Sequence, residues 1–323
     1  MSSFTFAHVA DMHWGSGEGT AQCANDAVTA MVDSLNAQAE HPLPDFVVFS
    51  GDNVDGGVPG PYDQGTTCER QTQALKRVLD RLAVPYHVIA HNHDVWGEDP
   101  VGMRIILGGA SGFPAGYQAG PTVLGSALRR HFGAASLRQV RQLPGHFTGV
   151  FMSECYVEDG AFRTLETEMG WLVEALLGAR GGPVLLFAHV PLLWPRHPET
   201  DDVFPSGSEV WNFSGAHSRL CALLTGAAER VVQYAGHLHV HGYNQSGRLH
   251  VVTTAGLCTY PGEYRLVTVH PDRIEHRCVR VPGVAERPMC WGSLVDEEHP
   301  TPEAFHGGVP RERDFAIPFS PVG

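Results

Sequence analysis

Apolar and polar positions alternate along this sequence in blocks that fit a series of strands and helices. Strand-like apolar runs occupy residues 4–10, 46–50, 85–90, 146–153, 183–188 and 231–235. Helical spacing of apolar residues is found between them, at 25–38, 69–83, 165–179 and 216–225. Three strand and helix units in succession predict a parallel sheet with right-handed crossovers. Later strands, at 249–255, 264–270 and 274–281, have short connections, which predicts added antiparallel pairs.

Two segments interrupt this regular pattern. Residues 95–145 are rich in glycine and proline, with helical spacing only at 124–132, and we interpret them as an insertion near the mouth of a site. Residues 194–214 form an aromatic, proline-containing stretch that fits a lid-like loop. From residue 282 onward the chain is Pro-rich and weakly patterned. We therefore predict one catalytic domain over 1–281 and a C-terminal extension, 282–323, that lies on the surface or on a partner subunit.

The composition is that of a soluble globular protein. Of the 323 residues 43% are hydrophobic and 18% are charged, and no run approaches the roughly 18 apolar residues of a membrane span. The formal net charge of -13 repels nucleic-acid backbones and disfavours a nucleic-acid partner. The cysteines form no CxxC pair and fit reduced thiols. Residues 1–10 carry no basic segment before their apolar run, so we expect no secretory signal and a cytoplasmic protein.

Residues with metal-binding side chains follow several of the predicted strands directly. They are Asp11 and His13; Asp52; Asn92, His93 and Asp94; His189; and His237 and His239. Because parallel strands place their carboxyl ends at one edge of a sheet, these groups can share a site. Asp11 and His13 can point the same way, since side chains alternate in extended backbone. Gly51 allows the sharp turn that holds Asp52 at the end of its strand.

In chain order these residues form the motifs DMH (11–13), GDNVD (51–55), HNHD (91–94), a lone His189, and GHLH (236–239). The set resembles the calcineurin-like metallophosphoesterase superfamily, whose pattern is DxH, GDxxD, GNHD or GNHE, a lone His, and GHxH. The resemblance covers roughly residues 4–280. It implies an α/β fold, a four-layer α-β-β-α sandwich of two mixed sheets flanked by helices. For Asp55, at the end of the second motif, turn capping is the expected role.

The resemblance also implies a role for each residue. Two sets would each bind one metal ion: Asp11, His13 and His239, and Asn92, His189 and His237. Asp52 would bridge the two ions. His93 would be the catalytic histidine, and Asp94 would orient it through its second ring nitrogen. The ions would be Mn, Fe, Zn or Co, because mixed nitrogen and oxygen ligands suit all four.

Such a centre suits an anionic phosphoryl group. Two divalent cations with the carboxylates of Asp11 and Asp52 leave a charge of about +2. Two metal ions about 3.5 to 4 Å apart can activate a shared water and clamp the attacking and leaving oxygens. The predicted reaction is hydrolysis of a phosphoester by direct attack of a metal-bridging hydroxide, with His93 as the general acid.

A phosphodiester is the preferred substrate class in this prediction. The reason is the similarity to the small bacterial diesterases of the superfamily, which share the chain length and an extended C-terminal segment. A phosphomonoester is the alternative substrate, because the same centre hydrolyses it. An alternative of another class is a non-catalytic binding scaffold on the same fold. The expected partners are a small phosphorylated substrate and, through the C-terminal extension, a second copy of the chain. Neither a membrane nor nucleic acid is expected.

One residue departs from the family pattern, since His91 stands where the family has glycine. If residue 91 has a positive φ, the strain is about 1 to 3 kcal/mol and is tolerated mainly at functional sites. If its backbone is extended, His91 can simply face solvent. The candidate substrate-pocket residues are His91, Asn53, Trp194, Arg196 and His197. Packing of a loop on the core would explain the last three equally well.

Overall fold

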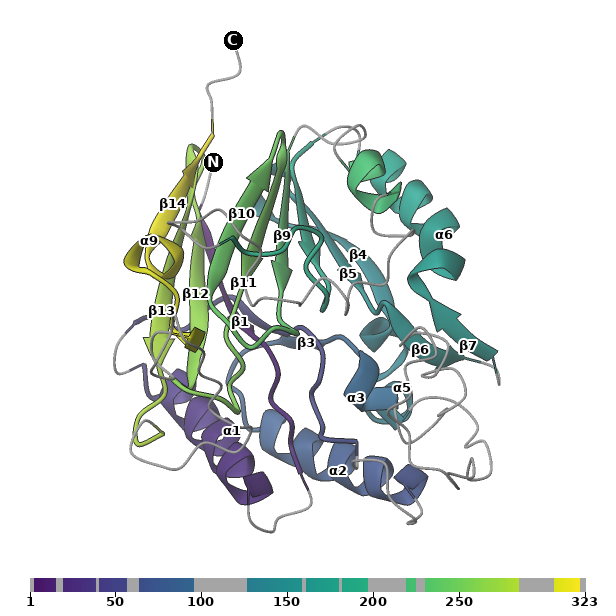
Figure 1. The fold of residues 1–323 in the computed structure, drawn as a ribbon, viewed down its shortest axis with the longest axis vertical. Coiled ribbons are helices and arrows are strands. Elements are labelled where there is room, and N and C mark those ends of the chain that lie inside the picture. Colours follow the sequence, from purple (N-terminus) through teal and green to yellow (C-terminus); the bar gives the residue numbers. More distant parts are fainter. Residues whose placement is uncertain are drawn as a thin grey trace.

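The computed structural model describes residues 3–15, 20–38, 41–56, 64–95, 127–158, 161–179, 182–196, 219–224, 230–284 and 305–319. Two six-stranded sheets pack against each other, and helices cover their outer faces (Figure 1). A two-stranded hairpin, β6 (Cys155–Glu158) and β7 (Ala161–Thr164), lies outside both sheets. Both sheets mix parallel and antiparallel pairs, so the predicted four-layer α/β sandwich is confirmed.

The first sheet has the order β14-β13-β12-β1-β2-β3. Its strands are β1 (Phe4–Val9), β2 (Phe46–Phe49), β3 (Tyr86–Val88), β12 (Glu263–Val269), β13 (Arg273–Arg280) and β14 (Phe315–Pro318). β1, β2 and β3 run parallel, as their connecting helices predict, whereas β1 pairs with β12 in the antiparallel sense. The carboxyl ends of β1, β2 and β3 therefore lie at the same edge of this sheet.

The second sheet has the order β10-β11-β9-β8-β5-β4. Its strands are β4 (Arg138–Gln142), β5 (Thr148–Met152), β8 (Val184–Phe187), β9 (Val231–Ala235), β10 (Gly242–Ser246) and β11 (Leu249–Thr253). β5, β8, β9 and β11 are parallel, and β4 and β10 are antiparallel strands at the two edges. The carboxyl ends of β8 and β9 consequently share an edge too.

Aromatic side chains fill the space between the two sheets. Phe6 of β1 stacks on Phe46 of β2, with ring centroids 5.4 Å apart. From the other sheet, Phe187 and Tyr234 meet Phe6 edge to face, at 5.3 and 5.0 Å. Because side chains alternate along β1, Phe6 faces this interior while Val9 faces the helices. This packing fixes the two sheets relative to each other.

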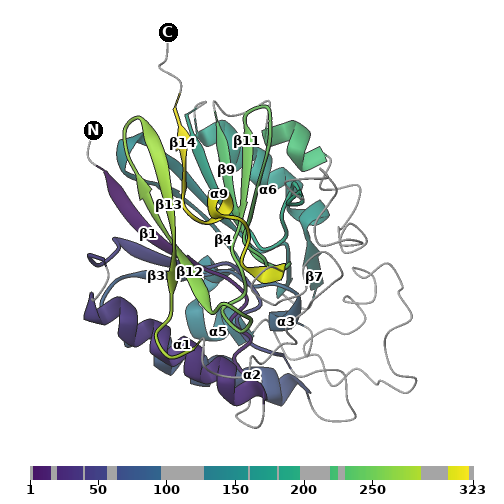
Figure 2. The same ribbon diagram turned by 60° about the vertical axis from the view of Figure 1, so that its left-hand side comes forward.

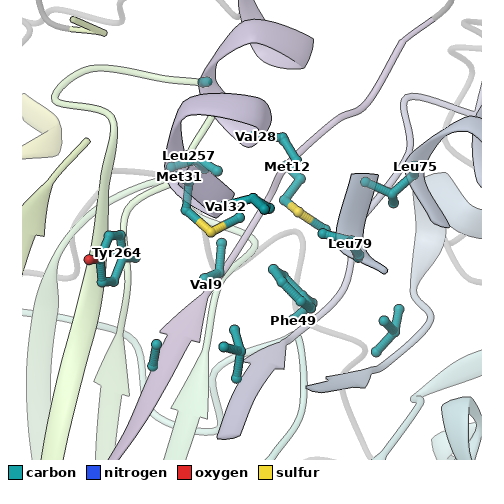
Figure 3. Close-up of a cluster of buried hydrophobic side chains, with 14 of the residues drawn as sticks. Val9, Met12, Val28, Met31, Val32, Phe49, Leu75, Leu79, Leu257 and Tyr264 are labelled. Carbon is teal, nitrogen blue, oxygen red and sulfur yellow. The ribbon is translucent and has the colours of Figure 1, made fainter. Parts of the chain in front are cut away.

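Helices bury the outer faces of the sheets. They are α1 (Thr20–Ala37) and α2 (Gln64–Leu79) on the first sheet, and α6 (Leu165–Gly178) on the second. Met31 of α1 and Leu79 of α2 pack on Val9 and Phe49, the outward-facing residues of β1 and β2 (Figure 3). Leu176 of α6 belongs to the matching cluster on the second sheet. None of the helices within the described residues is both long and apolar enough to cross a membrane.

The first two helices begin earlier than the apolar spacing predicts. α1 begins at Thr20 and not near residue 25, and α2 begins at Gln64 and not at residue 69. Asn25, where the apolar spacing starts, therefore lies inside α1. Its side chain accepts the N–H of Gly15 at 3.0 Å and donates to the carbonyl of Gly15 at 3.2 Å. Asn25 thus ties the loop after β1 to the helix.

Part of the predicted insertion belongs to the domain. Within 95–145, residues 96–126 lie outside the described residues, but the rest forms α5 (Ala127–Phe132), a 3-10 turn at Ala134–Ser136 and strand β4. β4 pairs with β5 and extends the second sheet. The sequence of β4, RQVRQ, does not predict a strand, because an edge strand with little burial needs no apolar run. Of the predicted lid-like loop, residues 197–214 lie outside the described residues.

The described part of the C-terminal extension also joins the domain. A short helix, α9 (Pro310–Arg313), leads into β14, which pairs with β13 at the edge of the first sheet (Figure 2). Arg265 of β12 donates to the carbonyls of Glu312 and Arg313, at 2.9 Å each. Residues 305–319 are therefore packed on the first sheet, and the division at residue 281 stays a prediction. A contact between two copies through this segment stays a prediction.

Candidate metal centre

The carboxyl ends of the parallel strands bring the predicted ligands to one edge of the sandwich. The loops after β1 and β2 are held together, because the N–H of His13 donates to the carbonyl of Asp52 at 2.9 Å. In the second sheet, the N–H of Gly236 donates to the carbonyl of His189 at 2.9 Å, which joins the loops after β8 and β9. The N–H of His237 then donates to the carboxylate of Asp11, at 3.0 and 3.1 Å. These bonds link the two sheets at the site.

Several of these residues have strained backbone. Positive φ angles occur at Asp11 (51°), His13 (44°), Asp52 (48°), His237 (69°) and His239 (56°). This left-handed region costs a non-glycine residue on the order of 1 to 3 kcal/mol and persists where the surrounding structure enforces it. The fold therefore enforces an unfavourable backbone at the places where side chains must turn toward a common point.

Two glycines allow the loops to approach so closely. A Cβ at Gly236 would lie 2.3 Å from Oδ2 of Asp11 and 2.6 Å from the Cβ of Ala10. A Cβ at Gly51, whose φ is 104°, would lie 2.6 Å from Nδ1 of His189. Neither position has room for a side chain without displacing a predicted ligand.

We expect Gly236→Ala to displace the Asp11 carboxylate and to lower kcat/KM toward a nitrophenyl phosphoester by about 10²-fold, since a shift of about 1 Å at a reacting centre can have that effect. The number of metal ions bound per protein should fall as well. Gly170→Ala is the matched control, because a Cβ there meets nothing within 4 Å. Turnover and elemental analysis of both purified variants make the measurement. Equal behaviour of the two variants would contradict the role given to Gly236.

One group of candidate ligands gathers around His239. Its Nε2 lies 3.2 Å from Oδ1 of Asp11 and 3.2 Å from Nε2 of His13. Nε2 of His13 is in turn 3.9 Å from Oδ2 of Asp52. The structure thus brings Asp11, His13 and His239 together and places Asp52 beside them.

A second group gathers around His189. Its Nδ1 donates to the carbonyl of Ser50 at 2.8 Å, so Nε2 is the nitrogen that faces the carboxylates. That Nε2 lies 3.2 Å from Oδ2 of Asp52 and 3.8 Å from Oδ1 of Asp11. The ring of His237 is 5.1 Å from that of His189, and one nitrogen of each lies within 4.8 Å of the other. Asp52 therefore faces both groups.

The buried charges depend strongly on one another. Burial lowers the pKa of His189, but the carboxylates of Asp52 and Asp11 outweigh it and raise this pKa to about 10. Burial raises the pKa of Asp52, whereas His189 and His93 pull it well below its ordinary value. Burial and His93 also hold the pKa of His13 well below its usual range. The two carboxylates thus favour positive charge at the point where the imidazoles meet them.

This set of residues fits a pair of divalent metal ions. Nε2 of His189 is buried without a hydrogen-bond partner and is directed at Asp52 and Asp11. Burying carboxylates and several imidazoles together without a cation is costly. Imidazole nitrogen with carboxylate oxygen suits Mn, Fe, Co and Zn alike, so the donors do not select one metal.

The predicted contact between Asp94 and the ring of His93 is wrong. Nδ1 of His93 instead donates to the backbone carbonyl of Asp55 at 2.9 Å. The Asp94 carboxylate accepts backbone N–H groups at 2.9 to 3.1 Å, from His91, Asn53 and Val54. Asp94 lies in α3 (Asn92–Val95) with its carboxylate toward the loop after β2. It therefore joins the loops after β2 and β3 and leaves the His93 ring to a carbonyl.

The other pocket candidates have mixed outcomes. Asn53 is fully buried, and its Nδ2 donates to the carbonyl of Ile89 at 2.7 Å and to Asp94 at 2.9 Å. Its Nδ2 ties the loop after β2 to the loop after β3, and a contact of Asn53 with substrate stays a prediction. Trp194 is buried and Arg196 is exposed, and a contact of either with substrate stays a prediction. Two candidates lie outside what the structure describes: His197 and the side chain of Asn92.

Glu154 lies at the site although it belongs to none of the sequence motifs. It is buried directly after β5, and its Oε2 accepts the N–H groups of His189 and Val190 at 2.7 Å each. Burial raises the pKa of Glu154 to about 7. Its position after a predicted strand is the same signal that identified the other residues, but a single glutamate there has many structural explanations.

Two further residues lie beside the predicted ligands. Sγ of Cys258 is 4.0 Å from Nδ1 of His239, on the side of that ring away from Asp11. The carboxylate of Asp55 has an oxygen within 4.8 Å of ring nitrogens of His13 and His93. Asp55 thus has a place at the site besides the turn position that we predicted.

Comparison with known proteins supports the same fold. A dimetal phosphatase from Danio rerio is 15% identical to this chain, with a TM-score of 0.57, over 85% of this chain and 95% of that chain. PhoD is 12% identical, with a TM-score of 0.56, over 90% of this chain and 68% of that chain. At such identities the similarity shows the fold alone. A search of curated protein sequences finds no match.

The sequence profile of calcineurin-like phosphoesterases matches residues 4–240, well over half of the chain. The match spans every predicted ligand, from Asp11 to His239. This chain therefore belongs to the calcineurin-like phosphoesterase family.

Proposed function

We propose that this protein hydrolyses a phosphodiester at a dimetal centre. This is a more specific version of the metal-dependent phosphoester hydrolysis of the family. The observation that carries the proposal is the position of Asp52. Its Oδ2 lies 3.2 Å from Nε2 of His189 and 3.9 Å from Nε2 of His13, between the two groups of nitrogen donors. A carboxylate that bridges two ions must lie in such a place.

The proposed ligands are Asp11, His13 and His239 for one ion, His189, His237 and Asn92 for the other, and Asp52 for both. When bound, two divalent ions would supply positive charge to the phosphoryl group and lower the pKa of a water molecule. The chain's own contribution is to hold these donors in place. Strained φ angles and the close approach at Gly236 and Gly51 do so before any ligand binds.

His93 is the proposed proton donor to the leaving group. Because a carbonyl can only accept, the contact with Asp55 fixes hydrogen on Nδ1 of His93 and leaves Nε2 for the transferred proton. The side chain is 7% exposed and its ring lies 4.5 Å from that of His13, so it borders the proposed ligands. An alkoxide leaving group benefits most from such an acid.

The charges near the centre support a diester over a monoester. The largest influences on the pKa values of His13, Asp52, His189 and His237 come from burial, imidazoles and carboxylates, with no Lys or Arg among them in the described part of the chain. A phosphodiester carries one negative charge and a monoester up to two. The described part of the site, where imidazoles and carboxylates are the strongest charges, suits the singly charged ester better.

We expect the metal-loaded protein to hydrolyse bis(p-nitrophenyl) phosphate with a higher kcat/KM than p-nitrophenyl phosphate. Steady-state kinetics with Mn, Fe, Co or Zn added to metal-free protein measure both values under the same conditions. A preference for the monoester would support a phosphomonoesterase instead. Absence of turnover with either ester and every metal would support a binding scaffold on this fold.

A further inference from the structure

His91 occupies the position of the family glycine without backbone strain. It is not among the positive-φ residues of the described chain, although its neighbours in the site, Asp52, His237 and His239, are. Its side chain is 0% exposed, so it does not face solvent either. The imidazole at this position therefore points into the protein, toward the groups that surround the site.

The ring of His91 packs beside the second group of candidate ligands. Its centroid is 4.3 Å from that of His189 and 5.8 Å from that of His237. One nitrogen from each of the three rings lies within 4.8 Å of the others. Three imidazoles thus converge at the place where the family pattern supplies two.

A buried carboxylate lies next to this ring. Oε2 of Glu154 is 3.7 Å from Nε2 of His91, and the same oxygen accepts the N–H groups of His189 and Val190. Two short backbone hydrogen bonds keep Glu154 in place at the end of β8. At 3.7 Å the two atoms form an ion-pair contact and not a hydrogen bond, and the carboxylate places negative charge beside the ring.

Burial decides between the roles open to His91. A substrate contact needs an accessible side chain, and His91 is 0% exposed while His93 is 7% exposed. Plain packing does not need a second and third imidazole around the same point, and burying them there without a cation is costly. Coordination of a metal ion explains both the burial and the convergence.

We propose that His91 is an additional ligand of the metal ion held by His189 and His237. This inference rests on the proposed dimetal centre. The second site then offers three imidazole nitrogens beside the Asp52 oxygen, a set richer in nitrogen than that of Asp11, His13 and His239. Nitrogen-rich sites favour Zn, Co and Fe(II) over Mn, so His91 biases this site toward those metals.

The test compares metal binding by the wild type with that of His91→Gly, which restores the family residue, and His91→Gln, which keeps a buried polar side chain. Metal-free proteins are titrated with Zn(II), Co(II) and Mn(II) by calorimetry, and the visible absorption of the Co(II) forms is recorded. His87→Gln is the control, because His87 lies on β3 and contacts Gln139 instead of the proposed ligands.

We expect both His91 variants to bind one Zn(II) ion at least about 10-fold more weakly, with a smaller loss for Mn(II) and a changed Co(II) spectrum. The His87→Gln protein should match the wild type. If the wild type binds two ions and the His91 variants show the same affinities and spectrum, His91 is not a ligand. If the wild type binds fewer than two ions, the proposed dimetal centre itself fails.

Discussion

Replacing Asp52 by asparagine should reduce kcat/KM for the preferred phosphoester by on the order of 10³-fold or more, the largest effect expected of any single side chain here. Asp52 is the carboxylate that both groups of imidazoles face, at 3.2 Å from His189 and 3.9 Å from His13. Asparagine keeps the shape and removes the negative charge. The variant should therefore also bind less than two metal equivalents, as elemental analysis would show.

Asp45→Asn is the matched control for this variant. Asp45 lies just before β2, at the opposite end of the strand from Asp52, and its exposed carboxylate accepts the N–H of Thr5 at 2.7 Å. The asparagine oxygen can keep that bond, so activity and metal content should stay at the wild-type level. Full activity of Asp52→Asn with two bound ions would refute a bridging role.

Replacing His93 by alanine should lower the rate by about 10²- to 10⁴-fold for esters with poor leaving groups, the range typical of general acid catalysis. Nitrophenyl esters should lose far less, because nitrophenolate leaves without protonation. The metal ions should remain bound, since the contact of residue 93 with Oδ1 of Asp52, at 3.0 Å, comes from the backbone N–H that alanine also has. The comparison is made by steady-state kinetics with two phosphodiesters, one with an alkyl and one with a nitrophenyl leaving group.

The two substrates serve as internal controls for His93→Ala. A loss of equal size on both would mean that His93 positions the substrate or the metal ligands and does not deliver a proton. A variant that loses its metal would show that His93 helps to hold the metal ligands. Either result would argue against His93 as the proton donor, and neither would contradict the proposed dimetal centre.

The buried strands could be predicted from the sequence, whereas the edge strands β4 and β10 could not. FVVF of β2 and VLLF of β8 are buried at every position, so they appear as unbroken apolar runs. β4 and β10, with the sequences RQVRQ and GYNQS, pair on one side only and are partly exposed. Their strand structure depends on the neighbouring strand and leaves no apolar pattern.

The same distinction applies to the site. Asp11, Asp52 and His189 could be predicted to meet, because each follows a parallel strand whose neighbours are set by connecting helices. The direction of a side chain within a loop could not be predicted. Asp94 follows the family pattern, yet a single turn of helix directs its carboxylate to the loop after β2, away from the His93 ring.

Backbone strain at the site was also beyond the sequence. Aspartate and histidine do not favour positive φ strongly enough to predict it at Asp52 or His239, and the conformation depends on contacts made by distant segments. The placement of His91 could not be predicted from the sequence either. From the sequence it could be strained or solvent-facing, but in the fold its φ is not positive and its side chain is fully buried beside His189 and Glu154.

The pairing of β1 has a consequence for how a newly made chain acquires this fold. β1 lies between β2 and β12, and Phe4 pairs with Val269, so one long edge of β1 has no neighbour until the ribosome has produced residue 269. Strand pairs so distant in sequence form slowly, and an unpaired edge can associate with other chains in the meantime. Protection by a chaperone during synthesis would therefore benefit this protein more than one whose neighbouring strands are consecutive.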